Sequence, residues 1–153
     1  MEIRQVDYKT LHSDPHFGVL AEEYKRSSTH ILPDPQGQES IYLQMEQAGL
    51  LTIMAAYEED LLIGFLSMLV SVLPHYGVPV GATESYFVAE KYRSTGAGLR
   101  LLHHAERAAE AQGATAMLVS APVGSRLDTI LSNKTSYEPV NRIHVRRLQC
   151  SPL

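Results

Sequence analysis

The chain has 153 residues, of which 44% are hydrophobic and 20% are charged, and its formal net charge is −4 at pH 7. These fractions are ordinary for globular proteins and argue against both intrinsic disorder and a membrane protein. The acidic balance argues against a general nucleic-acid binder, which would present a basic surface. The length suits one domain with an ordinary core, so we expect a single domain over residues 1–153.

The sequence favours a cytoplasmic protein without a membrane segment. Its longest apolar stretch, Leu61 to Leu73, is too short to cross a bilayer and contains glycine and serine. The N-terminal residues MEIRQVDYK have no apolar core, so we expect no secretory signal peptide. The single cysteine, Cys150, cannot form an internal disulfide, and we expect a surface or partly covered thiol there.

The first third of the chain predicts one strand and two helices. Glu2 to Tyr8 alternates between polar and apolar residues, which is typical of a strand. A helix is expected from Asp14 to Ser28, because apolar residues recur there at steps of three and four. His30 to Gln38 contains two prolines and a glycine and predicts a loop. A second helix follows from Glu39 to Ala48, with Gly49 as its C-cap.

The middle of the chain predicts three antiparallel strands in sequence order. Leu50 to Tyr57 is apolar almost throughout, as expected of a strand with both faces covered. A short acidic turn joins it to a return strand from Leu61 to Val70. The connection from Pro74 to Pro79 leads into a third strand, Val80 to Ala89.

The last third predicts a turn, two helices and two strands. A glycine-containing turn leads into an amphipathic helix that Gly113 ends. Ala114 to Val119 then suits a strand parallel to the third strand of the meander, because a helix connects the two. Ser125 to Asn133 suits a short helix, and Tyr137 to Leu148 suits a closing strand or hairpin.

The turn at Arg93-Ser94-Thr95-Gly96-Ala97-Gly98 has the properties of an anion site. Its glycines let the backbone approach a ligand, and the first amides of the following helix have no partner inside that helix. Arg93 adds a positive charge suited to a pyrophosphate or a 3'-phosphate. The plain alternative is a strand-to-helix turn without a ligand. Binding of some other nucleotide at this turn is disfavoured, because no Rossmann spacing with a downstream ribose-binding acid is present.

Val88 followed by Arg93-x-x-Gly96-x-Gly98-x-x-Leu101-Leu102 resembles motif A of the GNAT family of N-acetyltransferases. In that family the pattern R/Q-x-x-G-x-G/A cradles the pyrophosphate of acetyl-CoA. The order of predicted elements, β-α-α-β-β-β-α-β-α-β, is also similar to the family's. The resemblance therefore implies the GNAT fold, a mixed, mostly antiparallel central sheet flanked by helices in the α/β (α+β) class.

The resemblance also implies acetyl-CoA as co-substrate and a set of residues that bind it. The third strand of the meander would bind pantetheine through its backbone and polarise the thioester carbonyl, and the turn amides would bind the pyrophosphate. The cofactor-binding residues implied in this way are Phe87, Val88, Ala89, Arg93, Ser94, Thr95, Gly96, Ala97, Gly98 and Leu99.

Glu84 is the candidate general base. It lies in an otherwise uncharged run, Val78 to Ala89, and many GNAT proteins keep a glutamate near this position. A carboxylate beside apolar neighbours can have a raised pKa and accept a proton near neutral pH. The alternative is an exposed glutamate on the outer face of a strand. Strict alternation places Glu84 on the face of Tyr86 and opposite Ser85, but the bulge expected from the family would change this count.

The general acid is where the sequence departs from the family. Many GNAT proteins have a tyrosine in the helix that follows the fifth strand, and Ser132 occupies the matching position here. Its hydroxyl could bind the sulfur or a water, but it is a poor acid. Three outcomes are therefore open. Water or the substrate reprotonates the thiolate, another tyrosine such as Tyr86 replaces the missing one, or the enzyme is weak or inactive.

The seven histidines fit no pattern of metal ligands, so we expect no metal. His75 and Tyr76 lie in the connection that borders the acceptor pocket in many GNAT proteins, and we expect them to contact the substrate. A basic cluster from Arg142 to Arg147 alternates with apolar residues and is typical of the solvated edge of a strand. It weakly favours an acidic acceptor or an acidic partner surface.

The expected function is acetyl transfer from acetyl-CoA to a primary amine of a small molecule or peptide, directly and without a covalent enzyme intermediate. The alternative is an acyl-CoA-binding module that keeps the fold and has little or no activity, which the missing tyrosine favours. The resemblance also implies a homodimer that pairs through C-terminal strands.

Overall fold

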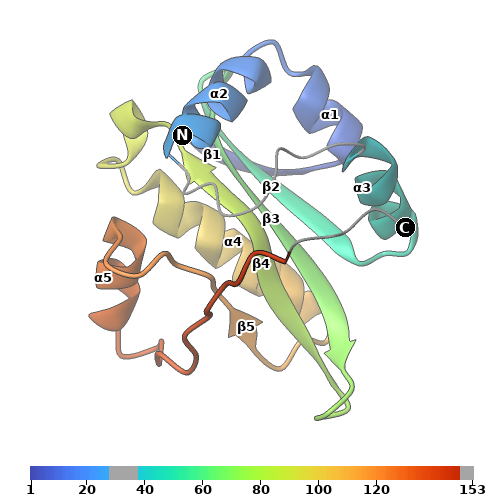
Figure 1. Ribbon diagram of the computed structural model, residues 1–153. Coiled ribbons are helices and arrows are strands. Elements are labelled where there is room, and N and C mark those ends of the chain that lie inside the picture. The colour runs from blue at the N-terminus through green and yellow to red at the C-terminus, as the bar shows by residue number, and fades with distance from the viewer. Residues whose placement is uncertain (28–37, 149–153) are drawn as a thin grey trace. The chain divides into compact units, whose positions relative to one another are not determined.

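The computed structural model describes residues 1–27 and 38–148 of the chain (Figure 1). The predicted loop from His30 to Gln38 and the predicted thiol at Cys150 lie outside these residues, except for Gln38, with which a helix begins. The described residues fall into two compact units, one that runs through Val119 and another that begins at Ser120. The elements of the first unit are β1 (Glu2–Val6), α1 (Tyr8–Ser13), α2 (Phe17–Ser27), α3 (Gln38–Gln47), β2 (Leu51–Glu58), β3 (Leu61–Leu73), β4 (Val78–Val88), the 3₁₀ turn η1 (Glu90–Tyr92), α4 (Ala97–Ala111) and β5 (Met117–Leu118).

The strands of the first unit form one five-stranded sheet in the order β1-β2-β3-β4-β5. All neighbours are antiparallel except β4 and β5, which are parallel, as a strand-helix-strand connection requires. This confirms the predicted mixed, mostly antiparallel sheet flanked by helices. The pairing of β5 with β4 is confined to Gly81 and Ala82. The stretch of β4 from Thr83 to Val88 therefore continues past its pairing with β5.

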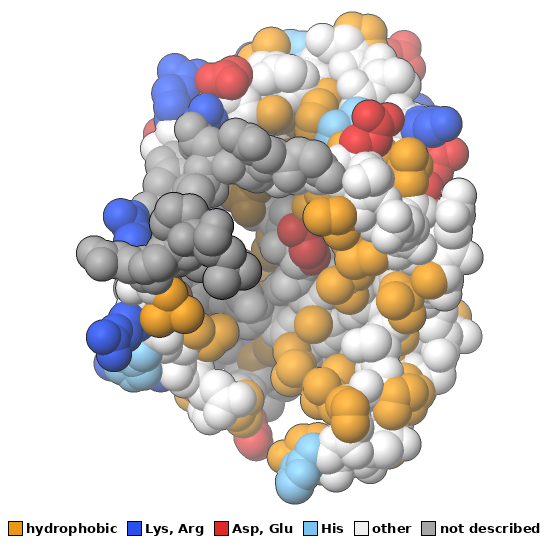
Figure 2. Space-filling view, turned by 45° about the vertical axis from the view of Figure 1, so that its right-hand side comes forward, with side chains coloured by type: hydrophobic (Ala, Val, Ile, Leu, Met, Phe, Trp, Pro, Cys, Tyr) orange, Lys and Arg blue, Asp and Glu red, His pale blue; other side chains and the backbone are white. Residues whose placement is uncertain are grey.

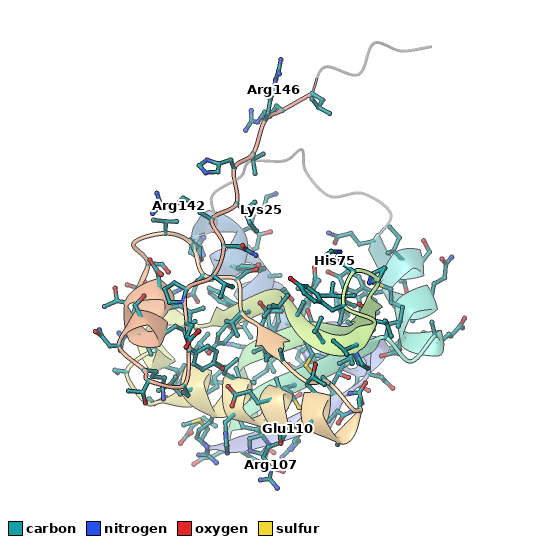
Figure 3. All side chains as sticks on the ribbon, turned by 90° about the horizontal axis from the view of Figure 1, so that it is seen from below. Lys25, His75, Arg107, Glu110, Arg142 and Arg146 are labelled. Carbon is teal, nitrogen blue, oxygen red and sulfur yellow. The ribbon has the colours of Figure 1, made fainter. Side chains whose placement is uncertain are left out.

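Helix α4 covers one face of the sheet. Its buried stripe of Leu101, Leu102, Ala105 and Ala109 packs on the strands, while Arg107 and Glu110 point away from the sheet (Figure 3). The packing is close, because a Cβ atom at Gly81 would lie 3.2 Å from Cβ of Ala109. The apolar residues of α4 recur on a single face, and burial of that face against the sheet stabilises the helix.

Helices α1, α2 and α3 supply the packing of the other face. Their apolar side chains join the inward-facing residues of β2, β3 and β4 in one core cluster. The cluster includes Tyr8, Leu11, Leu20, Ile53, Phe65 and Phe87. Aromatic rings are prominent in it, and the Phe65 and Phe87 ring centroids are 6.4 Å apart. No helix within residues 1–27 or 38–148 is long and apolar enough to cross a membrane.

The N-terminal elements differ from the prediction, because the first strand ends at Val6 and a short helix, α1, follows. Asp7 is the cause. Its carboxylate accepts a hydrogen bond from the Thr10 amide at 2.6 Å, which caps α1. The predicted strand to Tyr8 was too long, since apolar alternation across a capping residue does not continue a strand. The helix predicted from Asp14 begins at Phe17 instead, and it ends at Ser27.

The second unit contains α5 (Arg126–Ser132), which confirms the predicted short helix. Ser125 caps it by accepting a hydrogen bond from the Asp128 amide at 3.2 Å. The predicted closing strand or hairpin from Tyr137 to Leu148 is wrong, because these residues have no regular structure. Val140, Ile143 and Leu148 are 69%, 79% and 80% exposed. Alternation predicts a strand only where a sheet edge is present to pair with it.

Candidate active site

The glycine turn joins β4 to α4 as the sequence predicts. Gly96 caps α4 with φ of 82° and ψ of 4°, a left-handed conformation that favours glycine. The first intrahelical bond runs from the Arg100 amide to the Gly96 carbonyl at 3.1 Å. The amides of Ala97, Gly98 and Leu99 therefore precede the helical hydrogen-bond ladder, which leaves them available for an anion.

Gly98 has a packing role that the motif alone does not reveal. A Cβ atom at this position would lie 3.0 Å from the Tyr86 hydroxyl oxygen and 3.8 Å from Cγ2 of Val88. The second glycine thus lets the first turn of α4 lie against β4. Thr95 supports the turn from the other side, because its hydroxyl donates to the Tyr92 carbonyl at 2.7 Å.

Arg93 is tied to the end of β4. Its Nε donates to the Val88 carbonyl at 2.9 Å, and its guanidinium carbon lies 5.4 Å from the centroid of the Phe87 ring. The Ala89 amide donates to the Ile63 carbonyl at 3.0 Å. Because peptide groups alternate in direction along a strand, the Val88 amide points to the opposite edge, where β4 continues past β5.

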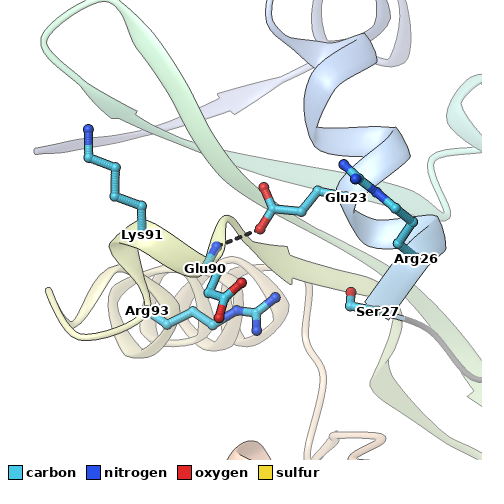
Figure 4. A pocket seen from close by; sticks show the side chains of 6 residues that line it. All are labelled: Glu23, Arg26, Ser27, Glu90, Lys91 and Arg93. Atoms are coloured by element: carbon cyan, nitrogen blue, oxygen red, sulfur yellow. Dashed lines mark hydrogen bonds between the residues drawn. The ribbon is translucent and has the colours of Figure 1, made fainter.

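An open cavity of about 730 Å³ lies beside this junction. Three positively charged and two negatively charged side chains line it together with a serine, and Figure 4 shows them. They are Glu23, Arg26, Ser27, Glu90, Lys91 and Arg93. Glu23 accepts a hydrogen bond from the Glu90 amide at 2.7 Å, which links α2 to η1. Sequence reasoning missed this cavity, since the two halves of its lining are far apart in the chain.

Glu84 lies in a bulge of β4. Ser85 pairs with Ser67 and Thr83 pairs with Met68, so Glu84 has no counterpart on β3. As anticipated, the bulge interrupts the alternation of side chains between the two faces of the sheet. Glu84 and Ser85 lie on the same side, as shown by the Ser67 hydroxyl, which is 2.6 Å from Oε2 of Glu84 and 2.6 Å from the Ser85 hydroxyl.

A tyrosine from α3 completes the surroundings of Glu84. The Tyr42 hydroxyl donates to Oε1 of Glu84 at 2.8 Å, and its ring stacks on Tyr8 with 5.0 Å between centroids. Burial raises the pKa of the Tyr42 hydroxyl, and the Glu84 carboxylate raises it further, so Tyr42 stays protonated. The Glu84 carboxylate is exposed and reachable by a ligand. Sequence reasoning missed Tyr42 and Ser67, because no local motif connects them to Glu84.

The remaining predicted site residues belong to β4, α5 and the β3–β4 turn. Tyr86 lies against Gly98 on the face that α4 covers, where burial, followed by the Glu106 carboxylate, raises the pKa of its hydroxyl. Ser132 is exposed and ends α5 in the second unit, and its role stays a prediction. His75 lies in the turn of the β3–β4 hairpin (Figure 3), with its ring edge-on to that of Tyr76 at 4.9 Å.

The β3–β4 hairpin also carries exposed apolar side chains. Val72, Tyr76 and Val78 are 55%, 70% and 36% exposed. Figure 2 shows apolar side chains gathered at the surface of one face of the molecule. Within residues 1–27 and 38–148, no group of three or more His, Cys, Asp or Glu side chains is arranged to hold a metal ion.

Solved structures share this fold over nearly the whole chain. The ribosomal-protein-alanine N-acetyltransferase from Brucella melitensis biovar Abortus 2308 has a TM-score of 0.69 and 17% sequence identity, over 97% of this chain and 100% of that one. The aminoglycoside N-acetyltransferase AAC(6')-Iy, in complex with the bisubstrate analogue CoA-S-monomethyl-acetylneamine, has a TM-score of 0.73 and 20% identity, over 97% and 98% of the two chains.

A third structure is an aminoglycoside acetyltransferase from an uncultured soil metagenomic sample, in complex with sisomicin. It has a TM-score of 0.73 and 17% identity, over 97% of this chain and 96% of that chain. A comparison with curated protein sequences found no match. The model of the acetyltransferase (GNAT) family matches residues 17–125. That match spans most of the chain and includes β4, the glycine turn and α4, so the chain belongs to the GNAT family.

Proposed function

We propose that residues 1–153 act as one domain that transfers an acetyl group from acetyl-CoA to a primary amine by direct attack. The observation that carries the proposal is the position of the Glu84 carboxylate. It is exposed on β4, the strand that leads into the glycine turn, and β4 continues there past its pairing with β5. A proton acceptor thus lies on the same strand as the amide groups suited to the cofactor.

The cofactor fits the groups that the junction offers. The uncapped amides of Ala97, Gly98 and Leu99, with Arg93 beside them, suit a pyrophosphate. The Val88 amide at the open edge of β4 suits the pantetheine arm, as in β-strand addition. Acetyl-CoA supplies the activated acetyl group when bound. Phe87 and Ala89, which flank Val88, are buried and keep this part of β4 in place.

Glu84 accepts the proton that the acceptor amine must lose, directly or through a water. An ammonium group has no lone pair with which to attack a thioester, so deprotonation precedes or accompanies attack. The oxygens of Glu84 already accept hydrogen bonds from Tyr42 and Ser67, which leaves further lone pairs for the incoming amine. Water or the acceptor itself returns a proton to the departing thiolate.

The acceptor is a small-molecule or peptide amine. Solved structures with this fold include aminoglycoside acetyltransferases and a ribosomal-protein-alanine N-acetyltransferase. Aminoglycosides and peptides with N-terminal alanine therefore belong in the first panel of acceptors, with polyamines beside them. His75 and Tyr76 in the β3–β4 turn are proposed to contact the acceptor.

Cofactor binding is tested by a thermal shift with acetyl-CoA. We expect the wild type to be stabilised, because a ligand that binds only the folded state raises its stability. Arg93→Ala should lose most of the shift, and Gly96→Trp should lose all of it. Arg100→Ala is the matched control, since Arg100 is exposed one turn further into α4. An unshifted wild type would contradict cofactor binding altogether.

Turnover is tested by thiol release with the acceptor panel. We expect Glu84→Gln to lower kcat roughly 100-fold or more, since general-base catalysis contributes at least that factor. Unchanged turnover in Glu84→Gln would remove the base assignment. The second candidate function is an acyl-CoA-binding module without activity, which Ser132 in place of a tyrosine favours. Tight binding of acetyl-CoA without turnover of any amine would support that alternative.

A further inference from the structure

Ser67 is a polar residue buried in the middle of β3. Its side chain is on the face of the sheet that carries Glu84, and the residue is only 3% exposed. A hydroxyl at such a position costs free energy unless hydrogen bonds satisfy it. Three such contacts surround it. They are Oε2 of Glu84 at 2.6 Å, the Ser85 hydroxyl at 2.6 Å and the Ser85 amide at 3.2 Å.

The number of available protons determines which group donates in each of these hydrogen bonds. The Ser85 amide can only donate, so Ser67 accepts there. An ionised Glu84 can only accept, so the single hydroxyl proton of Ser67 goes to Oε2 of Glu84. That proton is then unavailable to Ser85, whose own hydroxyl must donate to Ser67. Every hydrogen bond in the group therefore points toward the carboxylate.

Tyr42 holds the other oxygen of the same carboxylate. It comes from α3, so Glu84 is held by β3 on one side and by a helix on the other. Because Glu84 is the bulged residue of β4, the β-ladder does not position it directly. The two hydroxyls are what fixes its carboxylate relative to the sheet.

We propose that Ser67 and Tyr42 are positioning residues that hold the Glu84 carboxylate, one on each oxygen, at the β4 bulge so that it can accept the proton of the acceptor amine. The proposal rests on the proposed role of Glu84 as general base. Ser67 contributes more than Tyr42 to the position of Glu84, because its hydroxyl also accepts from the Ser85 amide and so holds the bulge. Neither residue needs to touch acetyl-CoA or the acceptor.

The test is a double-mutant cycle on thiol release with the best acceptor. Ser67→Ala and Tyr42→Phe should each lower kcat roughly tenfold, the scale expected for losing one hydrogen bond to a charged group. The KM for acetyl-CoA should be unchanged. In a Glu84→Gln background the same substitutions should have little further effect, because they act through Glu84. Ser71→Ala is the matched control, since Ser71 is an exposed serine on the same face of β3.

The split between kcat and KM separates positioning from a general structural role. Loss of a contact that only positions Glu84 should lower kcat and leave the KM for acetyl-CoA unchanged in both variants. Ser67→Ala could also disturb the bulge itself, and Tyr42→Phe covers this case because it removes only an oxygen from α3. An unchanged acetyl-CoA thermal shift confirms that each variant is folded.

Three results would overturn the proposal, and they are distinguishable. If Ser67→Ala and Tyr42→Phe behave like Ser71→Ala while Glu84→Gln is inactive, the positioning role is wrong and the proposed function stands. If their effects multiply with that of Glu84→Gln, they act elsewhere. If Glu84→Gln is fully active, or the wild type binds acetyl-CoA and acetylates nothing, the base assignment fails and the positioning role fails with it.

Discussion

Gly98 shows how one residue can serve both a motif and the packing beneath it. The sequence pattern explains this glycine by the approach of a ligand to the backbone. The structure adds the Tyr86 hydroxyl, which would lie 3.0 Å from a Cβ atom at position 98. Tyr86 is held by its neighbours, because α4 covers its face of the sheet. Packing against Tyr86 is therefore a second reason for glycine at position 98, where the family pattern allows either glycine or alanine.

This geometry predicts that the effect of Gly98→Ala depends on Tyr86. In the wild type we expect the substitution to lower the free energy of unfolding by about 1 kcal/mol, since crowding outweighs the gain in helix propensity. In a Tyr86→Phe background, where the hydroxyl oxygen is gone, it should be neutral or stabilising. Urea unfolding of the four proteins measures the coupling.

Gly18→Ala is the control for helix propensity alone. Gly18 is the second residue of α2, as Gly98 is of α4, and a Cβ atom there would meet nothing within 4 Å. Gly18→Ala should raise the free energy of unfolding by up to about 1 kcal/mol. Equal effects of Gly98→Ala with and without the Tyr86 hydroxyl would show that the contact is not the cause.

At the residue scale, the glycine turn of the candidate site could be predicted from the sequence, but the surroundings of Glu84 could not. The turn from Arg93 to Gly98 is local, so it could be identified from one continuous string of residues that resembles the family motif, although its glycine spacing alone is weak evidence. The group formed by Tyr42, Ser67 and Glu84 was not, because these residues come from α3, β3 and β4 and meet only when the sheet is formed. A serine and a tyrosine within apolar runs carry no local signal of that meeting.

At the scale of elements, helix α1 depends on a single cap. Asp7 accepts from the Thr10 amide, and hydrogen bonds with Thr10 lower the pKa of the Asp7 carboxyl. A carboxyl with a lowered pKa in the folded state contributes stability above its unfolded pKa. That contribution is lost as the pH falls through the folded pKa. The cap should therefore weaken in acid.

Asp7→Asn is the corresponding test, because asparagine also caps helices but does not titrate. The wild type should exceed Asp7→Asn in free energy of unfolding at neutral pH, and the difference should shrink below about pH 4, where aspartate protonates. Asp60→Asn, at an exposed acid in the β2–β3 turn, is the control. A difference that is the same at pH 7 and at about pH 3 would contradict a titrating cap.

The same cap explains an error of the sequence reading. Glu2 to Tyr8 alternates well enough for a strand, but Asp7 can also cap the start of a helix. The helix forms in place of the longer strand because α1 buries Tyr8 and Leu11 in the core, where they are 6% and 3% exposed. Longer elements with one strong pattern, such as β3 and α4, were predicted well.

At the scale of the whole molecule, the first unit contains the segments with strong sequence patterns, and the second unit contains segments with weak ones. The sheet and α4 bury long apolar runs, and their order could be predicted from periodicity and turns. Beyond Ser120 the sequence has no long apolar run, and the alternation from Tyr137 to Leu148 predicted a strand that the structure does not contain. A strand is a pairing between two segments, so one segment alone cannot predict it.

The stretch from Tyr137 to Leu148 has no regular secondary structure, and this predicts where proteolysis begins. Arg142 and Arg146 lie in it, are exposed and are drawn in Figure 3, and no strand or helix restrains the backbone around them. We expect limited trypsin digestion to cut first after Arg142 or Arg146, because proteases need an extended, accessible backbone. Arg107, on the exposed face of α4, should resist, since a protease would have to unfold the helix.

Mass spectrometry of early digestion products, with and without acetyl-CoA, identifies the first cut, and size-exclusion chromatography gives the oligomeric state of the same sample. An N-terminal fragment ending at Arg142 or Arg146 is expected under both conditions. Early protection of both sites in a dimeric sample would contradict an accessible backbone in this stretch, because it would mean that the stretch pairs as a strand with a second copy. The alternation of Ile143, Val145 and Leu148 with basic residues would then have predicted an interface strand rather than a closing strand of the same sheet.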